Sequence, residues 1–543
     1  MTKTNNKKSE KAPVVKTDLP GPKLETGIDA KWFLIGLVVF VAIITTIMMN
    51  NNHTDNSSTK VEGTISTDNG DLKINWDRYK TIDVALSETL TITESGTYHL
   101  TGSLDDGSII VNAGDGVVRL ILDNVNIKNN SGPAIACYSA DDLVIELVGE
   151  NTLEDNVSYS ADYDEDVTGT IYSKADLTFQ GDGTLNLIAN YQDGIIGKDD
   201  LKFNSGTYNI SANDDGIRGK DSVYIVAGNF TIDSAADAIK STNEIDAGKG
   251  FVLIESGDFN ITAGAKGIKA INSVLIYDGK FNIDSYDDAI HSNNYVGIKG
   301  GDIVIISGDD GIHADKELII DNGTVTISKS YEGLEAQAIT INGGKISVTS
   351  YDDGMNAGGG ADASATNRQG AGAFDADTSC ALTINGGDVY VNASGDGIDS
   401  NGYLYFNGGT VTVDGPTNNG NGALDAGVSI SMNGGKVVAI GSSGMAESLG
   451  ATSSVYSASI YFSSVQAAGT RIEIKNSAGE TIIDHASAKT FSHMSVGTED
   501  FKPNETYTIY LNDTKYQDFT ISNIVTTVGN GNTNQQMMHS GSR

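Results

Sequence analysis

The chain contains little cysteine, proline or aromatic residue for its length. Of 543 residues, 2 are cysteine, 6 are proline and 7% are aromatic. Cys137 and Cys380 match no cysteine-rich zinc spacing, and each stands beside apolar residues. We therefore expect two small core residues rather than a disulfide or a zinc site.

Positive charge is also scarce. The chain has 35 Lys and Arg residues against 71 Asp and Glu residues, which gives a formal net charge of −36. A surface of this sign repels the phosphates of DNA and RNA, so a nucleic-acid partner is not expected. The same surface attracts cations.

One long apolar run interrupts the polar sequence. Residues 32–49, "WFLIGLVVFVAIITTIMM", are 18 residues without a charge, long enough for a helix of about 27 Å. The preceding residues 1–31 carry seven Lys and four acidic residues, a net of +3, which predicts a cytoplasmic tail, a transmembrane anchor and an extracellular remainder. A cleaved signal peptide is the alternative, but no small-x-small site follows the run. Residues 50–69 are interpreted as a polar linker, and the protein as a single-pass cell-membrane protein.

An internal repeat organises the rest of the chain. Acidic residues precede a small residue again and again, with spacings of 22, 22, 29, 22, 22, 22, 21 and 43, at Gly194, Gly216, Ala238, Gly267, Ala289, Gly311, Gly333, Gly354 and Gly397. Between these positions lie three short stretches of alternating polarity, joined by Gly and Asn. Equivalent strands recur in one direction, which predicts an all-β parallel β-helix with coils of about 22 residues over residues 70–445. Residues 446–528 are expected to form an antiparallel β cap, and residues 529–543 a disordered tail.

The repeat would stack the acidic residues. Equivalent residues of successive coils lie about 4.8 Å apart, so carboxylates in such a column need protons, basic partners or metal ions. Two residues after each small residue stand Arg218, Lys240, Lys269, His291 and His313, but then Glu335, Asn356 and Asp399. Oxygen ligands without basic partners suit calcium. The predicted calcium ligands are Asp309, Asp310, Glu332, Glu335, Asp352, Asp353, Asn356, Asp396, Asp399 and Asp425.

Simpler interpretations apply to several of these residues. Asp-Gly is a preferred turn pair, and we favour that explanation for the earlier coils. His291 and His313 are expected to stack as neutral rings that bond to the corner rather than to bind zinc. Four tyrosines near the acidic corner could stack on sugar rings or cover the turn: Tyr191, Tyr286, Tyr331 and Tyr351.

Several longer segments resemble a known family. They include "GTYHLTGSLDDGSIIV", "GPAIACYSADDLVIEL", "IYSKADLTFQGDGTLNL" and "NETYTIYLNDTKYQDFTISNIVTTVG". Over roughly residues 70–528 the chain is similar to the bacterial carbohydrate-binding, calcium-containing β-helix family related to pectate lyases. The resemblance implies a right-handed parallel β-helix, bound calcium, and binding of polysaccharide such as cellulose or polygalacturonate.

Two functions remain open at this point. The first is a surface-anchored, monomeric polysaccharide-binding protein in which calcium bridges acidic protein and acidic polymer. The second is a calcium-dependent polysaccharide lyase, which needs a basic side chain to remove a proton from the uronate; the candidates are Lys240 and Lys269. An adhesin or wall spacer without a sugar ligand is a third possibility.

Overall fold

The computed structural model describes residues 14–15, 74–358 and 376–530. The predicted anchor (32–49), the linker (50–69) and nearly all of the predicted terminal tails lie outside these ranges. Within them, none of the helical structure has the length and apolar character to span a membrane. It consists of one short 3-10 helix, η1 (Trp76–Arg78). All other regular structure there is β, as predicted.

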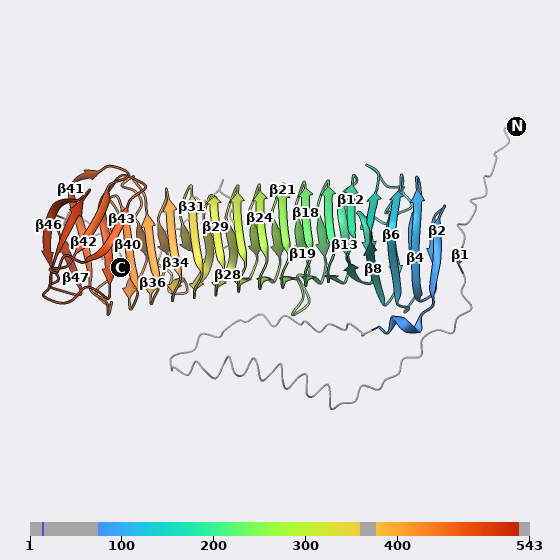
Figure 1. Cartoon of the computed structure of the whole chain (residues 1–543), viewed down its shortest axis with the longest axis horizontal. Coiled ribbons are helices and arrows are strands. Elements are labelled where there is room, and N and C mark those ends of the chain that lie inside the picture. Colours follow the sequence, from blue (N-terminus) through green and yellow to red (C-terminus); the bar gives the residue numbers. More distant parts are fainter. Residues whose placement is uncertain (1–13, 16–73, 359–375, 531–543) are drawn as a thin grey trace, which may run out of the picture. The chain divides into compact units, whose positions relative to one another are not determined.

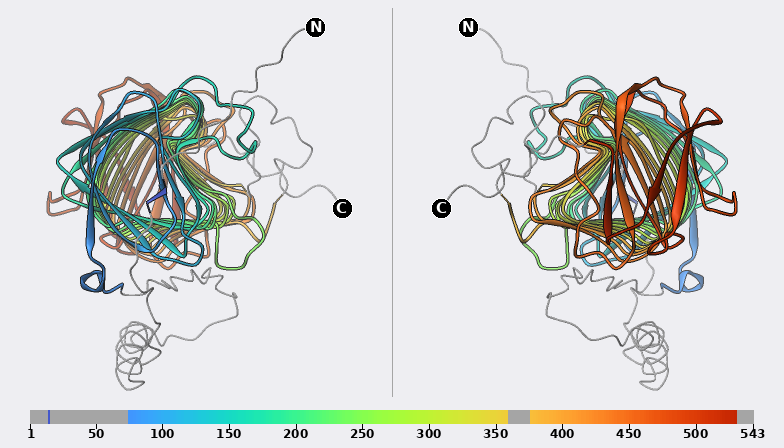
Figure 2. Two further views of the ribbon diagram at one scale, coloured as in Figure 1. Left: turned by 90° about the vertical axis from the view of Figure 1, so that its right-hand side faces the viewer. Right: turned by 90° about the vertical axis from the view of Figure 1, so that its left-hand side faces the viewer.

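The strands form a parallel β-helix with three strand stacks, shown side-on in Figure 1 and end-on in Figure 2. The first coils contain β2 (Thr81–Leu86), β3 (Leu90–Ile92), β4 (Gly96–Leu104), β5 (Ile109–Asn112), β6 (Val118–Lys128), β7 (Ile135–Ser139), β8 (Asp142–Val148), β9 (Glu150–Glu154), β10 (Gly169–Ser173), β11 (Asp176–Gly181), β12 (Thr184–Ala189), β13 (Asp193–Gly197) and β14 (Asp200–Phe203). The two-residue strand β1 (Val14–Val15) pairs with β3.

The later coils repeat the same three strands. The first stack continues through β16 (Ile217–Gly219), β19 (Ile239–Ser241), β22 (Ile268–Ala270), β25 (Ile290–Ser292), β28 (Ile312–Ile320), β30 (Leu334–Ile341), β32 (Met355–Ala357), β35 (Ile398–Ser400) and β38 (Leu424–Ala426). The second comprises β17 (Ser222–Ile225), β20 (Phe251–Ile254), β23 (Ser273–Ile276), β26 (Tyr295–Ile298), the ends of β28 and β30, β33 (Ala381–Ile384), β36 (Tyr403–Phe406) and β39 (Ser429–Met432).

The third stack holds the longer strands and much of the core. It contains β15 (Thr207–Ala212), β18 (Asn229–Ser234), β21 (Asp258–Ala263), β24 (Lys280–Ser285), β27 (Asp302–Ser307), β29 (Thr324–Lys329), β31 (Lys345–Ser350), β34 (Asp388–Ala393), β37 (Thr410–Asp414) and β40 (Lys436–Gly441). Polar and apolar residues alternate in these strands, and the apolar set faces inward. Phe259 stacks between Phe230 and Phe281, with ring centroids 4.9 and 4.6 Å apart.

The register follows the repeat spacing read from the sequence. Ile217 pairs with Ile239, Ile290 with Ile312, and Met355 with Ile398 across the 43-residue interval. The small residue at each corner has a steric cause: a Cβ on Gly333 would lie 2.2 Å from the carbonyl oxygen of Gly354 in the next coil.

An antiparallel unit follows the last coil, as the sequence predicts. β44 (Phe491–Thr498) pairs antiparallel with both β40 and β41 (Ser457–Gln466), and β41 pairs with β47 (Val525–Val528). A separate sheet has the order β43 (Thr481–Ala486), β42 (Arg471–Lys475), β45 (Thr506–Leu511), β46 (Thr514–Thr520). Cys137 and Cys380 are buried and free, as expected.

Candidate functional site: the acidic corner

The acidic corner begins the first-stack strands, and its carboxylates bond the coils together. In several coils the acid just before the small residue accepts, through Oδ1, the backbone N–H of the equivalent residue one coil on. The acceptor–donor distances are 3.2 Å for Asp215 and Asp237, 3.0 Å for Asp288 and Asp310, and 2.6 Å for Asp353 and Asp396. The column therefore has a structural role that a turn preference alone does not explain.

In the earlier coils, basic side chains neutralise the second carboxylate oxygen. Lys240 Nζ lies 2.6 Å from Asp215 Oδ2 and 3.2 Å from Asp237 Oδ2, and Arg218 lies 3.1 Å from Asp193 Oδ2. Burial lowers the pKa of Lys240, but the two carboxylates outweigh it and hold that pKa above its ordinary value. A lysine held protonated in this way is poorly suited to be the base of a lyase.

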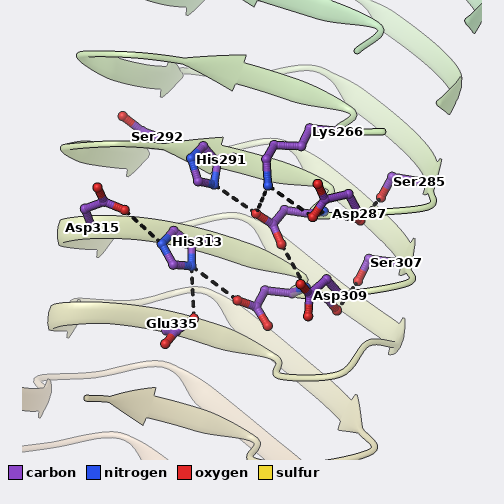
Figure 3. Close-up of polar contacts among 12 residues, drawn as sticks. Lys266, Ser285, Asp287, His291, Ser292, Ser307, Asp309, His313, Asp315 and Glu335 are labelled. Carbon is purple, nitrogen blue, oxygen red and sulfur yellow. Dashed lines mark hydrogen bonds and ion pairs between the residues drawn. The ribbon is translucent and has the colours of Figure 1, made fainter. Parts of the chain in front are cut away.

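The coil of Asp288 has two basic partners (Figure 3). Lys266 Nζ lies 2.6 Å and His291 Nδ1 lies 2.8 Å from Asp288 Oδ2. All three side chains are buried. Burial alone would raise the pKa of Asp288, yet His291 and Lys266 hold it below the ordinary range.

His313 occupies the equivalent place one coil further on, and its ring stacks on that of His291 at 4.9 Å. The stacking was predicted. The ring was expected to be neutral, but three carboxylates surround it. Burial lowers its pKa, whereas the carboxylates of Asp310, Asp315 and Glu335 raise it to about 12. These carboxylates favour the protonated form of the His313 ring.

Beyond Glu335 the partners in the column are oxygen atoms and one amide. Asn356 Nδ2 donates to Glu332 Oε2 at 3.1 Å, while its Oδ1 is buried without a hydrogen-bond partner. Asn356 is 8% exposed, and it pairs in register with Glu335 on one side and Asp399 on the other. Asp399 in turn pairs with Asp425. Residues paired in register point to the same side, so these oxygens form one row.

The carboxylates of these last coils shift each other's pKa. Burial and the Asp353 carboxylate raise the pKa of Asp396 to about 8, and burial with Asp353, Asp396 and Asp425 raises that of Asp399 to about 9. Glu447 joins this group: burial and Asp425 raise its pKa to about 8. The repeat could not reveal Glu447, because it follows the last coil.

The predicted calcium ligands thus separate into two groups. Asp310 and Glu335 contact His313, and Asp309 lies with Asp287 and Asp288, all three carboxylates being within 4.8 Å of one another. The second group, which we call the oxygen cluster, has no histidine and consists of Asp353, Asn356, Asp396, Asp399, Asp425 and Glu447. Glu332 links the groups through Asn356, and Asp352 is half-buried, as is its neighbour Asp353.

The four predicted tyrosines differ in exposure. Tyr286 is 80% and Tyr351 is 77% exposed, and Tyr331 lies beside Tyr351 with ring centroids 6.1 Å apart. Tyr191 instead stacks on Tyr159 at 4.3 Å, so a neighbouring side chain covers one of its ring faces. Tyr286, Tyr331 and Tyr351 are the better placed to meet a ligand at this corner.

Part of the chain is similar in sequence to known proteins. Residues 87–354 match the model of a family described as "Carbohydrate-binding domain-containing protein". A relative of that description from Acetivibrio thermocellus is 34% identical over 145 residues, 26% of this chain and 50% of the relative. The matched part of the chain is thus similar to carbohydrate-binding domain-containing proteins. It spans about half the length of the curated relative that it matches.

A solved structure is also similar. It is described as a polysaccharide lyase-like protein from C. thermocellum, determined as a gadolinium derivative. The two sequences are 30% identical, and the TM-score is 0.37. The match covers 44% of this chain and 96% of that chain. The carbohydrate-binding family match ends at residue 354. Asp310, His313 and Glu335 fall inside it, whereas Asn356 and most of the oxygen cluster lie beyond it.

Proposed function

We propose that this protein binds an acidic, plant-type polysaccharide at the acidic corner, with calcium held by the oxygen cluster. The homology supports a carbohydrate ligand in general. The observation that carries the finer proposal is the buried Asn356 Oδ1, which has no hydrogen-bond partner and stands in register between Glu335 and Asp399.

The oxygen cluster fits calcium in its chemistry. Calcium takes oxygen ligands from carboxylates and amide carbonyls, and the cluster carries carboxylates on successive coils beside the amide oxygen of Asn356. Burying carboxylates side by side without a cation is unfavourable, as the raised pKa values of Asp396, Asp399 and Glu447 indicate. A bound calcium would neutralise them at neutral pH.

The charge of the protein gives the ion a second role. A chain of net charge −36 and a polyuronate repel each other, so close contact needs a bridging cation. The exposed rings of Tyr286 and Tyr351 lie along the same corner and offer apolar faces for sugar rings. Bridging and stacking together favour uronate polymers such as polygalacturonate over neutral ones.

The test compares polymers and metal states of the full-length protein. Binding to immobilised polygalacturonate is measured with calcium and after complete removal of metal by EDTA, with cellulose as the neutral polymer. We expect loss of polygalacturonate binding in EDTA, and about tenfold weaker calcium affinity in Asp399→Asn, which removes one ligand charge. Asp388→Asn, an exposed acid of β34, is the matched control and should leave both unchanged.

Two results would overturn parts of this proposal. Polygalacturonate binding that persists without metal would exclude calcium bridging but leave carbohydrate binding intact. Steady release of unsaturated sugar, lost in Lys269→Ala, would establish the alternative, a polysaccharide lyase.

We further propose that residues 32–49 anchor the protein in the cell membrane with residues 1–31 in the cytoplasm. The charge distribution and the length of the apolar run support this arrangement. It excludes the β1–β3 pairing, because Val14–Val15 would then lie across the membrane from the β-helix. Protease treatment of intact cells distinguishes the membrane anchor from the β1–β3 pairing. An anchored chain loses the β-helix and keeps residues 1–31 protected.

A further inference from the structure

One nitrogen atom, His313 Nδ1, faces two carboxylates at once. It lies 3.2 Å from Asp310 Oδ2 and 3.0 Å from Glu335 Oε2. The three side chains are 0%, 3% and 8% exposed, and their ligand atoms lie within 4.8 Å of one another. A single N–H points in one direction, so hydrogen bonding to both oxygens is a compromise. A positive ion between the three atoms would meet all of them directly.

The spacing matches that of ligands around a small divalent metal. Metal–ligand bonds of about 2.0 Å in a tetrahedron place neighbouring ligand atoms roughly 3.3 Å apart, close to the two distances found here. A mixed set of one imidazole nitrogen and two carboxylate oxygens suits zinc and similar first-row metals, whereas calcium strongly prefers oxygen. The nitrogen therefore distinguishes this triad from the oxygen cluster two coils further on.

A strand irregularity orients the histidine from its other side (Figure 3). The register between β28 and β30 shifts after Ala314, where one residue more lies in β28 than in β30. This bulge carries Asp315, whose Oδ1 lies 3.1 Å from His313 Nε2. Metal-binding histidines usually donate their second ring N–H to a carboxylate or carbonyl, which fixes the ring and leaves the other nitrogen for the metal. Bulges often direct a side chain in this way.

The preceding coil shows what the triad lacks. His291 stands in register with His313, but its Nδ1 faces Asp288, which Lys266 already neutralises at 2.6 Å. Asp310 instead shares His313 with a second carboxylate, Glu335, which stands in register with His313 one coil further on. A lysine helps to neutralise the carboxylate of Asp288, and a divalent ion would do the same for Asp310 and Glu335.

We propose that Asp310, His313 and Glu335 form a buried site for zinc or a similar first-row divalent metal, separate from the calcium of the oxygen cluster. Asp315 is a positioning residue for His313. Because the triad is buried within the stack, the metal would join two successive coils and contribute to folding stability rather than meet a substrate.

The experiment measures metal content and ligand identity in the full-length protein. The protein is purified without a histidine tag, stripped of metal, reconstituted with zinc in excess calcium, and freed of unbound metal. We expect one tightly held zinc per chain, and visible absorption bands of a tetrahedral nitrogen–oxygen site after cobalt replaces zinc. His313→Gln and Glu335→Gln should each lose the zinc and the cobalt bands.

The matched control is His291→Gln, which alters the stacked ring outside the triad and should retain the zinc. Asp399→Asn should also retain the zinc while weakening calcium binding. Failure of the zinc proposal and failure of the calcium proposal are therefore distinguishable. Asp315→Asn should keep the metal but shift the cobalt bands. Wild-type protein that holds no zinc and shows no cobalt bands would overturn the proposal, even if the triad variants fail to fold. Retention of zinc by both His313→Gln and Glu335→Gln would also overturn it.

Discussion

Asp288 Oδ1 accepts the backbone N–H of Asp310 at 3.0 Å, while its Oδ2 binds Lys266 and His291. One buried carboxylate thus joins two coils and holds two basic groups. The corner therefore joins successive coils through buried polar contacts, and it also contains groups that can bind ligands.

Removing the charge of Asp288 tests this double role. Asp288→Asn keeps an oxygen for the N–H of Asp310 but removes the buried negative charge that Lys266 and His291 contact, so we expect a loss of about 3 kcal/mol in the free energy of unfolding. Adding Lys266→Met should recover most of it. Urea unfolding measures both, with the exposed Asp302→Asn as control. Equal losses in the single and double variants would show that the charge pair is not the cause.

The oxygen cluster predicts a particular pH dependence. The pKa values of Asp396 and Asp399 rise from 3.8 to about 8 and about 9 on folding, so between those limits the folded state binds more protons than the unfolded state. Stability without metal should then fall as the pH rises from about 4 to about 9. Calcium favours the ionised carboxylates, so the difference in Tm with and without calcium should widen over the same range. Scanning calorimetry of wild type and Asp399→Asn measures it, and the variant should show the shallower slope.

The exposed tyrosines predict an effect on binding without an effect on stability. Tyr286→Ala and Tyr351→Ala should each weaken polysaccharide binding about fivefold, or ~1 kcal/mol, because each removes an exposed aromatic face. Titration calorimetry gives the affinity, and Tm should stay unchanged. Tyr277→Ala, a 48% exposed tyrosine outside the corner, is the control; equal weakening there would place the ligand elsewhere.

The phenylalanine stack predicts an effect on stability without an effect on binding. Phe259 is 3% exposed and touches aromatic rings of the coils on both sides. Phe259→Ala should lower the free energy of unfolding by about 3–5 kcal/mol through a cavity in the core, with sugar affinity unchanged. Replacing the exposed Val304 by Ala should leave stability almost unaffected, and urea unfolding compares the two.

The coil repeat was predictable because its cause is local. Alternation of polar and apolar residues defines each strand, and small residues at the corner meet the carbonyl of the next coil, as Gly333 meets that of Gly354. Both leave a regular trace in the sequence. The antiparallel cap was equally visible, since its strands are longer and lack the 22-residue spacing. The right-handed winding stays a prediction from the family resemblance.

The site was only partly predictable. The spacing placed Asp310 in the column of corner carboxylates and Glu335, Asn356 and Asp399 in the row two residues after the small residue. It could not tell which oxygen of a carboxylate points along the stack and which points outward. It also missed Asp315, whose position depends on a bulge, and Glu447, which comes from the segment after the last coil. Such contacts depend on the three-dimensional path of the chain rather than on its period.

The antiparallel pairing of β44 with β40 has a consequence for self-association. A parallel coil from another molecule would need the free edge of the last coil, and β44 already occupies part of that edge. Within the described part of the chain, β40 therefore has no free edge for a parallel strand of a second copy. The cap thus removes one of the strand edges through which a long β-helix could add copies and grow into a fibre.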